Sequence, residues 1–362
     1  MKLHIHLGFG LDGEAVTWEP SGNVQLAITG QSGQGKSYKL CDMMLQLSTQ
    51  GVHTIVLDGS GEFGPDASGK PAAWPPPGTR FLDISSPELP VGTFFPWAMP
   101  SGKMERMEQC ARRAAGTLKQ QFHLGGNQYF YLKKICAGCL ADSQELSFSR
   151  IMESLEETAQ SAQAAGECTP EESAEVKLAV SLLPKLDILS DFPDTNPHWF
   201  HPFATPGTTV IDVQDVPDPY LLKTILEMLL GNLWTQKVRS HTGCPLVLVF
   251  DECQDLNFQA GSILDRILRK GRKYEIAGWF STQWFKDEAM TKALGQTAAD
   301  IFFRPALRDC KKTAALLAPG DRELYEACLE ALDSLRPGQF FFYDREEPIL
   351  VDGWEGNDCV QR

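Results

Sequence analysis

The chain has 362 residues, of which 43% are hydrophobic and 22% charged, and this composition is typical of a soluble globular protein with one large domain or two smaller ones. A formal net charge of −14 at pH 7 argues against a broad nucleic-acid-binding surface, although a local basic loop stays compatible with it. No stretch is long and apolar enough for a membrane span, no signal peptide is evident, and the ten cysteines lack regular spacing. The sequence therefore predicts a cytoplasmic protein with reduced thiols.

The first segment is expected to be β-structure. Residues 3–7 and 15–18 alternate in polarity like strands. Between them, residues 8–13 formally match the dinucleotide-binding pattern G-x-G-x-x-G, but that pattern must open a helix. The residues that follow alternate instead and lead to Pro20, so we interpret residues 8–13 as a hairpin turn.

A glycine-rich loop follows a short apolar strand predicted at residues 24–29 and precedes a helix predicted at 37–48. The loop matches the P-loop pattern G-x-x-x-x-G-K-[ST], in which exposed backbone N–H groups surround phosphate oxygens. Lys36 is expected to reach the β- and γ-phosphates of ATP, and the Ser37 hydroxyl to bind Mg²⁺. The nucleotide-binding residues predicted here are Gly30, Gln31, Ser32, Gly33, Gln34, Gly35, Lys36, Ser37 and the adjoining Tyr38.

The rest of the chain alternates between apolar strands and helices, with one interruption. Residues 103–190 have the periodicity of about four helices and are interpreted as a helical insertion. Outside it, helices are expected at 217–240, at 259–270 and twice within 307–333, and strands at 53–58, 80–84, 208–213, 245–250, 276–282, 301–304 and 339–343. This order predicts an α/β fold with a mostly parallel central sheet.

Two predicted strands lead into acidic residues. The apolar strand at 245–250 runs directly into Asp251 and Glu252. A P-loop nucleotidase needs one carboxylate beside the Mg²⁺ shell and a base that orients the attacking water. Asp251 suits the first role and Glu252 the second. An earlier core strand ends in Asp58 and leads to Glu62, at the edge where parallel sheets bind ligands.

Residues 266–274 form the most basic stretch of the chain, and the strand that follows leads to Gln283, whose polar side chain can sense a γ-phosphate. Three interpretations of the basic stretch stay open from the residues alone. An arginine there can reach the site of a neighbouring subunit, contact DNA phosphates, or simply complement a helix dipole in solvent.

Several of these segments together resemble the HerA/FtsK superfamily of P-loop motor ATPases, and HerA-like members most closely, with similarity also to the conjugation ATPases of type IV secretion. The matching segments are residues 28–33, 58–63, 249–252 and 269–274, followed by Gln283. The resemblance implies a RecA-like P-loop NTPase core at 24–102 and 207–362, an all-helical insertion at 103–206 and a short N-terminal β segment at 1–23.

The resemblance also implies roles for individual residues. Arg272 would be an arginine finger that acts in trans, and Gln283 a γ-phosphate sensor, both catalytic together with Lys36 and Glu252. Glu62 would join the nucleotide-binding residues, and Mg²⁺ would be held by Ser37 and Asp251, as expected above. Members of the superfamily look like homo-hexameric rings that move DNA through a central channel with ATP.

This sequence departs from the HerA-like pattern at two places. Ser60 stands where such proteins usually carry a histidine, and the N-terminal barrel is reduced to residues 1–23, so the resemblance does not extend to that barrel. The sequence therefore predicts a DNA-translocating ring ATPase that works with a nuclease or other effector in DNA processing, transfer or anti-phage defence. The alternative is an ATP-switched oligomeric assembly or signalling module that does not move DNA, which the acidic net charge favours.

Overall fold

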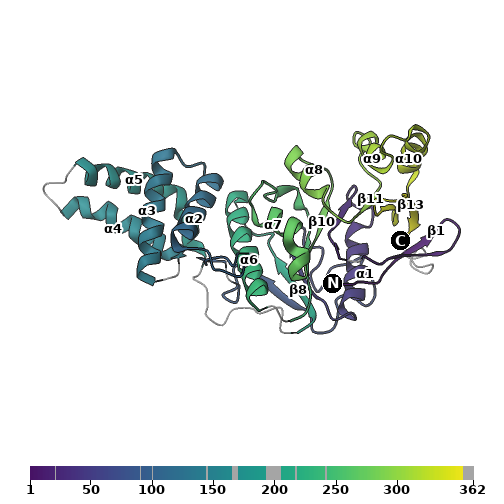
Figure 1. Ribbon diagram of the computed structural model, residues 1–362, viewed down its shortest axis with the longest axis horizontal. Helices are drawn as coiled ribbons and strands as arrows, with labels where there is room; N and C mark the ends of the chain where they lie inside the picture. Colours follow the sequence, from purple (N-terminus) through teal and green to yellow (C-terminus); the bar gives the residue numbers. More distant parts are fainter. Residues whose placement is uncertain are drawn as a thin grey trace. The chain divides into compact units, whose positions relative to one another are not determined.

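Figure 1 shows the computed structural model of the chain, which describes residues 1–20, 22–89, 91–99, 101–143, 146–164, 170–192, 205–216, 218–240 and 243–353. Contacts divide the chain into two compact units. The first unit contains the segments Met1–Leu82, Pro202–Gln214 and Thr242–Arg362, and the second contains Asp83–His201 and Asp215–His241. The helix predicted at 217–240, which we expected to belong to the core, lies in the second unit.

The first unit is built on a sheet of eleven strands in the order β2-β1-β13-β12-β11-β3-β10-β9-β4-β8-β5. The strands of this sheet are β1 (Ile5–Gly10), β2 (Ala15–Trp18), β3 (Leu26–Thr29), β4 (His53–Asp58), β5 (Arg80–Asp83), β8 (Gly207–Asp212), β9 (Leu246–Phe250), β10 (Ile276–Thr282), β11 (Ala299–Phe303), β12 (Gln339–Tyr343) and β13 (Ile349–Asp352). The strands from β11 to β8 pair in parallel, which confirms the predicted α/β fold with a mostly parallel central sheet.

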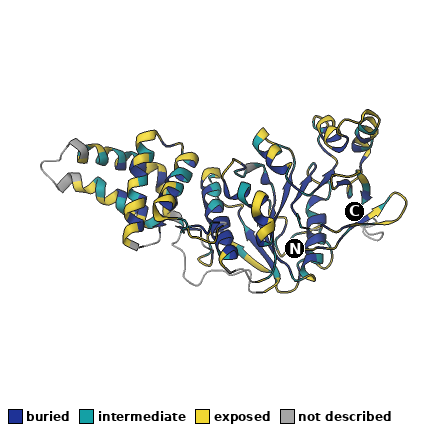
Figure 2. Ribbon diagram, viewed as in Figure 1, coloured by how far each residue is buried: buried dark blue, intermediate teal, exposed yellow. Residues whose placement is uncertain are grey.

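The central strands carry apolar residues on both faces because both faces are covered. Every residue of β3, β4, β9 and β10 is buried. Figure 2 shows the central strands in dark blue, the colour of buried residues. A strand buried on both faces is characteristic of a parallel sheet with helices packed on it.

An antiparallel set of strands extends one side of the sheet. β12 pairs with β11 and β13, and β1 pairs with β13 and β2. The N-terminal segment therefore adds a hairpin to the main sheet, and its turn includes a hydrogen bond of 2.9 Å from the Gly10 N–H to the Glu14 carbonyl. Residues 8–13 thus end one strand and form a turn before the next, as the sequence indicated. Strand β13 was not predicted.

Alternation along β11 and β12 places side chains in two separate cores. Ile301 and Phe303 belong to the core on the side of helix α1 (Lys36–Ser48). Phe302 points the other way and packs with α9 (Cys310–Leu317) and α10 (Arg322–Ser334). Because successive strand residues face opposite sides, one short strand supports both layers.

Two more helices and two short 3-10 turns belong to the first unit. The helices are α7 (Ile263–Lys270) and α8 (Glu288–Leu294), and the turns are η2 (Cys253–Asp255) and η3 (Gly271–Tyr274). Helix α7 begins at a Ser262 cap, whose hydroxyl accepts a hydrogen bond from the Asp265 N–H, a common way to satisfy a free helical N–H. Helix α8 was not predicted.

The second unit is helical, apart from a two-stranded ribbon of β6 (Thr93–Phe94) and β7 (Leu146–Ser147). Its helices are α2 (Met107–Gln121), α3 (Gly126–Ser143), α4 (Phe148–Ala164), α5 (Pro170–Leu186) and α6 (Pro219–Ser240), with the 3-10 turn η1 (Asp187–Asp191). Helix α6 is anchored there because the Trp234 indole donates a 3.2 Å hydrogen bond to the Ala98 carbonyl. None of the helices in the described part of the chain is long and apolar enough to cross a membrane.

Gly30, the first residue after β3, packs closely against β11, and this contact predicts the effect of a substitution on stability. A Cβ added to Gly30 would lie 2.5 Å from the Phe303 Cβ, so Gly30→Ala must push β11 away. We expect a loss of about 3 kcal/mol in the free energy of unfolding, measured by urea denaturation. Gly33→Ala is the matched control, since it meets nothing within 4 Å and adds only left-handed strain of about 1 kcal/mol. Equal losses for both variants would contradict this packing.

Candidate functional site

The glycine loop lies at the centre of the parallel sheet, between the carboxyl ends of neighbouring strands. The Gly30 N–H donates to the Thr282 carbonyl at the end of β10 (3.3 Å), and the Gln31 N–H donates to the Arg304 carbonyl after β11 (2.9 Å). Gly33 and Gly35 take φ angles of 76° and 103°, which glycine adopts without strain. The loop therefore curls in front of β3 and presents the amino end of α1.

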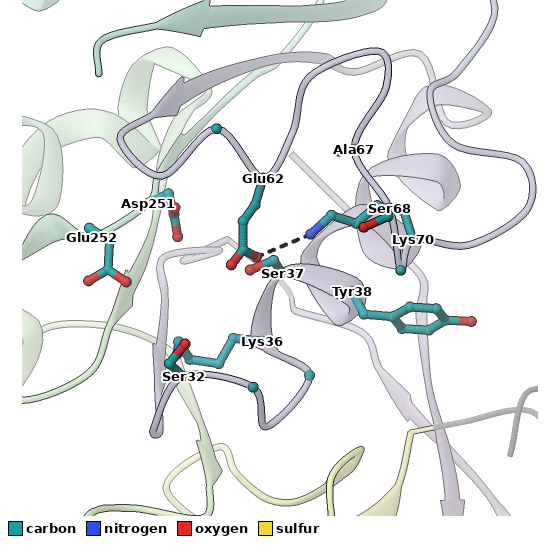
Figure 3. A pocket seen from close by; sticks show the side chains of 14 residues that line it. Ser32, Lys36, Ser37, Tyr38, Glu62, Ala67, Ser68, Lys70, Asp251 and Glu252 are labelled. Atoms are coloured by element: carbon teal, nitrogen blue, oxygen red, sulfur yellow. Dashed lines mark hydrogen bonds and ion pairs between the residues drawn. The ribbon is translucent and has the colours of Figure 1, made fainter. Parts of the chain in front are cut away.

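Figure 3 shows the cavity in front of this loop, which has a volume of about 730 Å³. Its lining residues come from three places: the P-loop and α1, the segment after β4, and the end of β9. They are Ser32, Gly33, Gly35, Lys36, Ser37, Tyr38, Gly61, Glu62, Ala67, Ser68, Gly69, Lys70, Asp251 and Glu252. Nine of these fourteen are predicted site residues, so most of the predicted residues share one cavity.

The other predicted loop residues have supporting positions. Gly30 packs against Phe303, as described above. The Gln31 carbonyl accepts a 3.0 Å hydrogen bond from the Lys36 ammonium, and the Gln34 carbonyl accepts a 2.9 Å hydrogen bond from the Gly338 N–H. These contacts hold the loop's shape rather than line its cavity.

Lys36 places a buried positive charge beside the P-loop. Its side chain is 7% exposed. Burial lowers the pKa of Lys36, while the carboxylates of Glu252, Asp251 and Glu62 oppose that shift. An ammonium that is poorly hydrated and close to exposed backbone N–H groups favours an anionic ligand.

Asp251 follows β9 directly and faces the same cavity. Burial raises the pKa of the Asp251 carboxyl to about 6, against the hydrogen bond that it accepts from the Ser60 hydroxyl. Ser60, the departure from the HerA-like histidine, therefore acts on Asp251. Its turn is held by Asp58, whose carboxylate accepts hydrogen bonds from the Gly61 and Phe63 N–H groups at 2.8 and 3.0 Å.

Ser37 and Glu62 form a hydroxyl–carboxylate pair in the middle of the cavity. Burial alone would raise the pKa of Glu62, but the hydrogen bond from Ser37 and the positive charge of Lys70 lower it. Within the described residues, no group of three or more His, Cys, Asp or Glu side chains is arranged to hold a metal ion. The oxygens of Ser37 and Asp251 suit Mg²⁺, which in proteins is commonly held by one or two carboxylates together with substrate phosphates.

Glu252 is fixed in position by two glutamines. Its carboxylate accepts 2.8 Å and 2.7 Å hydrogen bonds from the side-chain amides of Gln283 and Gln254. Gln254 is itself held by the Thr282 hydroxyl at 3.1 Å. Glu252 also has a left-handed backbone, with φ 52° and ψ 47°, an unfavourable conformation often found at functional sites. A carboxylate held in this way is positioned to accept a proton from water.

Arg272 lies at the amino-terminal ends of the parallel strands, whereas the cavity lies at their carboxyl-terminal ends. It is exposed in η3, before the first residue of β10, whereas the P-loop lies beyond the last residues of the strands. Its guanidinium lies close to Gly22, ahead of β3, where an added Cβ would be 2.6 Å from the Arg272 Cζ. The seven residues of β10 span about 20 Å, so Arg272 cannot reach the P-loop of its own chain.

Site residues that the sequence analysis did not single out belong to irregular segments. Gly61 and Ala67 to Lys70 line the cavity and come from the segment after β4, and Gln254, which holds Glu252, lies in η2. In sequence, residues 64–80 are rich in Pro and Gly and show no helical or strand periodicity. Lys70 is a basic residue in that segment, but only the folded chain brings it to the phosphate loop.

This fold and this cavity define a P-loop NTPase of the RecA-like type. The sequence matches the family described as Helicase HerA, central domain, over residues 23–233, which is more than half of the chain. The protein therefore belongs to that family. No curated protein matches the chain in sequence.

Solved structures are similar in fold. VirB4 of Thermoanaerobacter pseudethanolicus superposes with a TM-score of 0.75 and 16% identity, over 99% of this chain and 98% of VirB4. The bacterial conjugative coupling protein TrwBdeltaN70 has a TM-score of 0.60 and 14% identity, over 97% of this chain and 94% of its own. Plasmid coupling protein TrwB in complex with ADP and Mg²⁺ has a TM-score of 0.58 and 13% identity, over 98% and 95%.

The cavity predicts separable effects for two substitutions. Lys36→Ala should weaken ATP binding and abolish hydrolysis, because it removes the cation expected to pair with the β- and γ-phosphates. Glu252→Gln should keep ATP bound while hydrolysis stops, because it removes only the proton acceptor. Equilibrium binding and phosphate release measure the two effects. Turnover by Glu252→Gln at the wild-type rate would exclude this residue as the base.

Proposed function

We propose that this chain is an ATP- and Mg²⁺-dependent motor ATPase that works as a ring of six identical subunits and translocates DNA. One observation carries the proposal: a single cavity combines the buried ammonium of Lys36, the Mg²⁺-suited oxygens of Ser37 and Asp251, and a Glu252 carboxylate fixed by two glutamines. The complex of the similarly folded TrwB with ADP and Mg²⁺ supports this choice of ligand.

The residues of the cavity divide the work of phosphoryl transfer to water. Backbone N–H groups of the P-loop bind phosphate oxygens, and Lys36 offsets the charge on the β- and γ-phosphates. Ser37 and Asp251 hold Mg²⁺, which supplies further charge neutralisation when it is bound. Glu252 takes the proton of the attacking water, and Gln283 keeps Glu252 aimed while it senses the γ-phosphate.

The position of Arg272 supports the proposed ring. Because it lies at the edge away from its own cavity, we propose that it completes the cavity of a neighbouring subunit. A head-to-tail contact of this kind generates a ring when its rotation closes. Six subunits and a central DNA channel are proposed from the family membership and from similarity to VirB4 and to the coupling protein TrwB. We further propose a nuclease or other effector as a partner in DNA processing, transfer or defence.

An ATP-switched assembly module that does not move DNA is the second candidate. The net charge of −14 favours it, because a channel for DNA needs positive charge. Membership of a family named for a helicase favours the motor. Whether Lys and Arg side chains line the centre of the oligomer separates the two candidates.

Arg272→Ala should leave folding and nucleotide binding close to wild type while it cuts ATP turnover by about 10³-fold, because a guanidinium in trans offsets charge that develops on the γ-phosphate. Steady-state ATPase on an oligomer of defined size measures this. Arg322→Ala is the matched control, since Arg322 is also exposed and, among the described residues, its recognised ion pair is with Glu326 on its own helix. Full activity in isolated monomers would rule out a shared site.

Mixed rings provide a sharper measurement. Arg272→Ala subunits assembled with Lys36→Ala subunits should regain activity wherever an intact P-loop meets an intact arginine. Mixed assembly is checked by native mass spectrometry. Rings shown to be mixed but without recovered activity would contradict the model.

DNA binding by the ATP-loaded oligomer should weaken steeply with salt and depend little on sequence, because a motor holds DNA through its phosphates. Fluorescence anisotropy measures the affinity for DNA at salt concentrations between about 50 and 200 mM. Over roughly this range, phosphate contacts lose several orders of magnitude in affinity. Binding that ignores ionic strength, or no detectable binding, would favour the assembly module.

A further inference from the structure

Lys70 is a cavity residue that neither the P-loop nor a strand end supplies. It lies in the irregular segment after Glu62, and its side chain is only 7% exposed. Figure 3 shows its ammonium turned toward Glu62, and the Nζ lies 3.2 Å from the Glu62 Oε2. The chain therefore brings a second buried cation, from a separate segment, to the same cavity as Lys36.

The surroundings of Lys70 satisfy its charge only in part. An ammonium carries three protons to donate. Within the described residues, the recorded hydrogen bond from Lys70 goes to Glu62, whose side chain is 49% exposed, and the Phe63 ring lies under the ammonium at 5.3 Å. Burying a charge is costly unless it is well compensated. The position thus has capacity for a further anion.

Glu62 links this lysine to the centre of the site. The same carboxylate accepts the hydrogen bond of Ser37, the hydroxyl suited to Mg²⁺. A Ser37 oxygen that holds Mg²⁺ through a lone pair can keep donating its proton to Glu62. The Glu62–Lys70 pair therefore adjoins the residue expected to lie beside the ion.

The charge balance of the cavity points the same way. Its lining includes three carboxylates, those of Glu62, Asp251 and Glu252, and two ammonium groups, those of Lys36 and Lys70. A polyphosphate adds several more negative charges. Without Lys70, Lys36 would be the single side-chain cation among the residues that line the cavity, against three carboxylates and the negative charges of the polyphosphate.

We propose that Lys70 is a second phosphate-binding lysine of this site, and that Glu62 holds its ammonium in position until the phosphates of a bound nucleotide take over the ion pair. This rests on the proposed function, because it assumes that a nucleoside polyphosphate occupies the cavity. Binding then draws residues 67–70 onto the ligand, so the segment after β4 forms part of the nucleotide site rather than a passive excursion.

Calorimetric titration with MgADP, and with a non-hydrolysable ATP analogue and Mg²⁺, tests the role of Lys70 without requiring turnover. Lys70→Met keeps most of the apolar stem and removes the charge, and it should weaken binding about tenfold or more. Lys70→Arg should stay within about threefold of wild type because it restores a cation. Lys134→Met, which removes an ion-paired lysine that does not line the cavity, is the matched control and should bind like wild type.

The same titration in a Glu62→Gln background separates binding from positioning. If Lys70 contacts phosphate, adding Lys70→Met to Glu62→Gln should still weaken MgADP binding about tenfold. If Lys70 only positions Glu62, the second substitution should change nothing. A loss of less than about threefold in the wild-type background, or one that disappears in the Glu62→Gln background, would overturn the proposal.

Amine acylation of the wild-type protein gives an independent measurement should Lys70→Met fail to fold. Saturating MgADP should slow labelling of Lys70, read by mass spectrometry, and leave Lys134 unchanged. Equal labelling of Lys70 with and without MgADP would overturn the role of Lys70 while leaving the ATPase proposal intact. Failure of the wild-type chain to bind any nucleotide would overturn both.

Discussion

The parallel pairing of β3 with β10, and of β10 with β9, is the constraint on which the site depends. It places the carboxyl ends of these three strands side by side, so residues far apart in sequence meet there. Gly30, Asp251 and Gln283 each follow one of these three strands. Both faces of these strands are buried, so a shift of one residue in any pairing would disturb the packing against both covering layers and would also separate these groups. Packing and chemistry therefore fix the same register.

Charge is the second constraint. The sheet edge gathers carboxylates that repel one another, and the burial of Asp251 raises its pKa to about 6. The structure compensates with hydrogen bonds from Ser60 and from the glutamines at Glu252, and with the ammonium groups of Lys36 and Lys70. A cavity that holds its acids this way is organised for a cationic ion and an anionic ligand together, since either alone would leave the charge unbalanced.

The sequence allowed prediction of those parts of the fold that are determined locally. Strands β4, β10 and β12 occur at the predicted boundaries, because continuous or alternating apolar runs bounded by turn residues leave little freedom. The P-loop and the pair Asp251–Glu252 were recognisable for the same reason. Helix α8 has seven residues, too few for a helical period to stand out, and β13 exists only through its pairing with β1 and β12.

The parts of the site that were missed lie on irregular segments, whose path the sequence pattern does not indicate. Gln254 reaches Glu252 because η2 turns the chain back after β9, and Lys70 reaches the cavity along an irregular path. Ser60 was noted only as a departure from a pattern, although its hydroxyl acts on Asp251. Side chains on turns have no periodicity, so their direction follows only from the folded backbone.

The distance between Arg272 and the P-loop has a consequence for control. If each chain carries the pocket at one end of its parallel strands and the completing arginine at the other end, a lone subunit would bind nucleotide without hydrolysing it. At low concentration the subunits would then hydrolyse little ATP, and a high local concentration on a scaffold or a filament would raise the rate of hydrolysis. Copy number and local concentration would regulate hydrolysis without a dedicated inhibitor. A truncated or mismatched partner would inactivate only the sites at the interfaces that it forms.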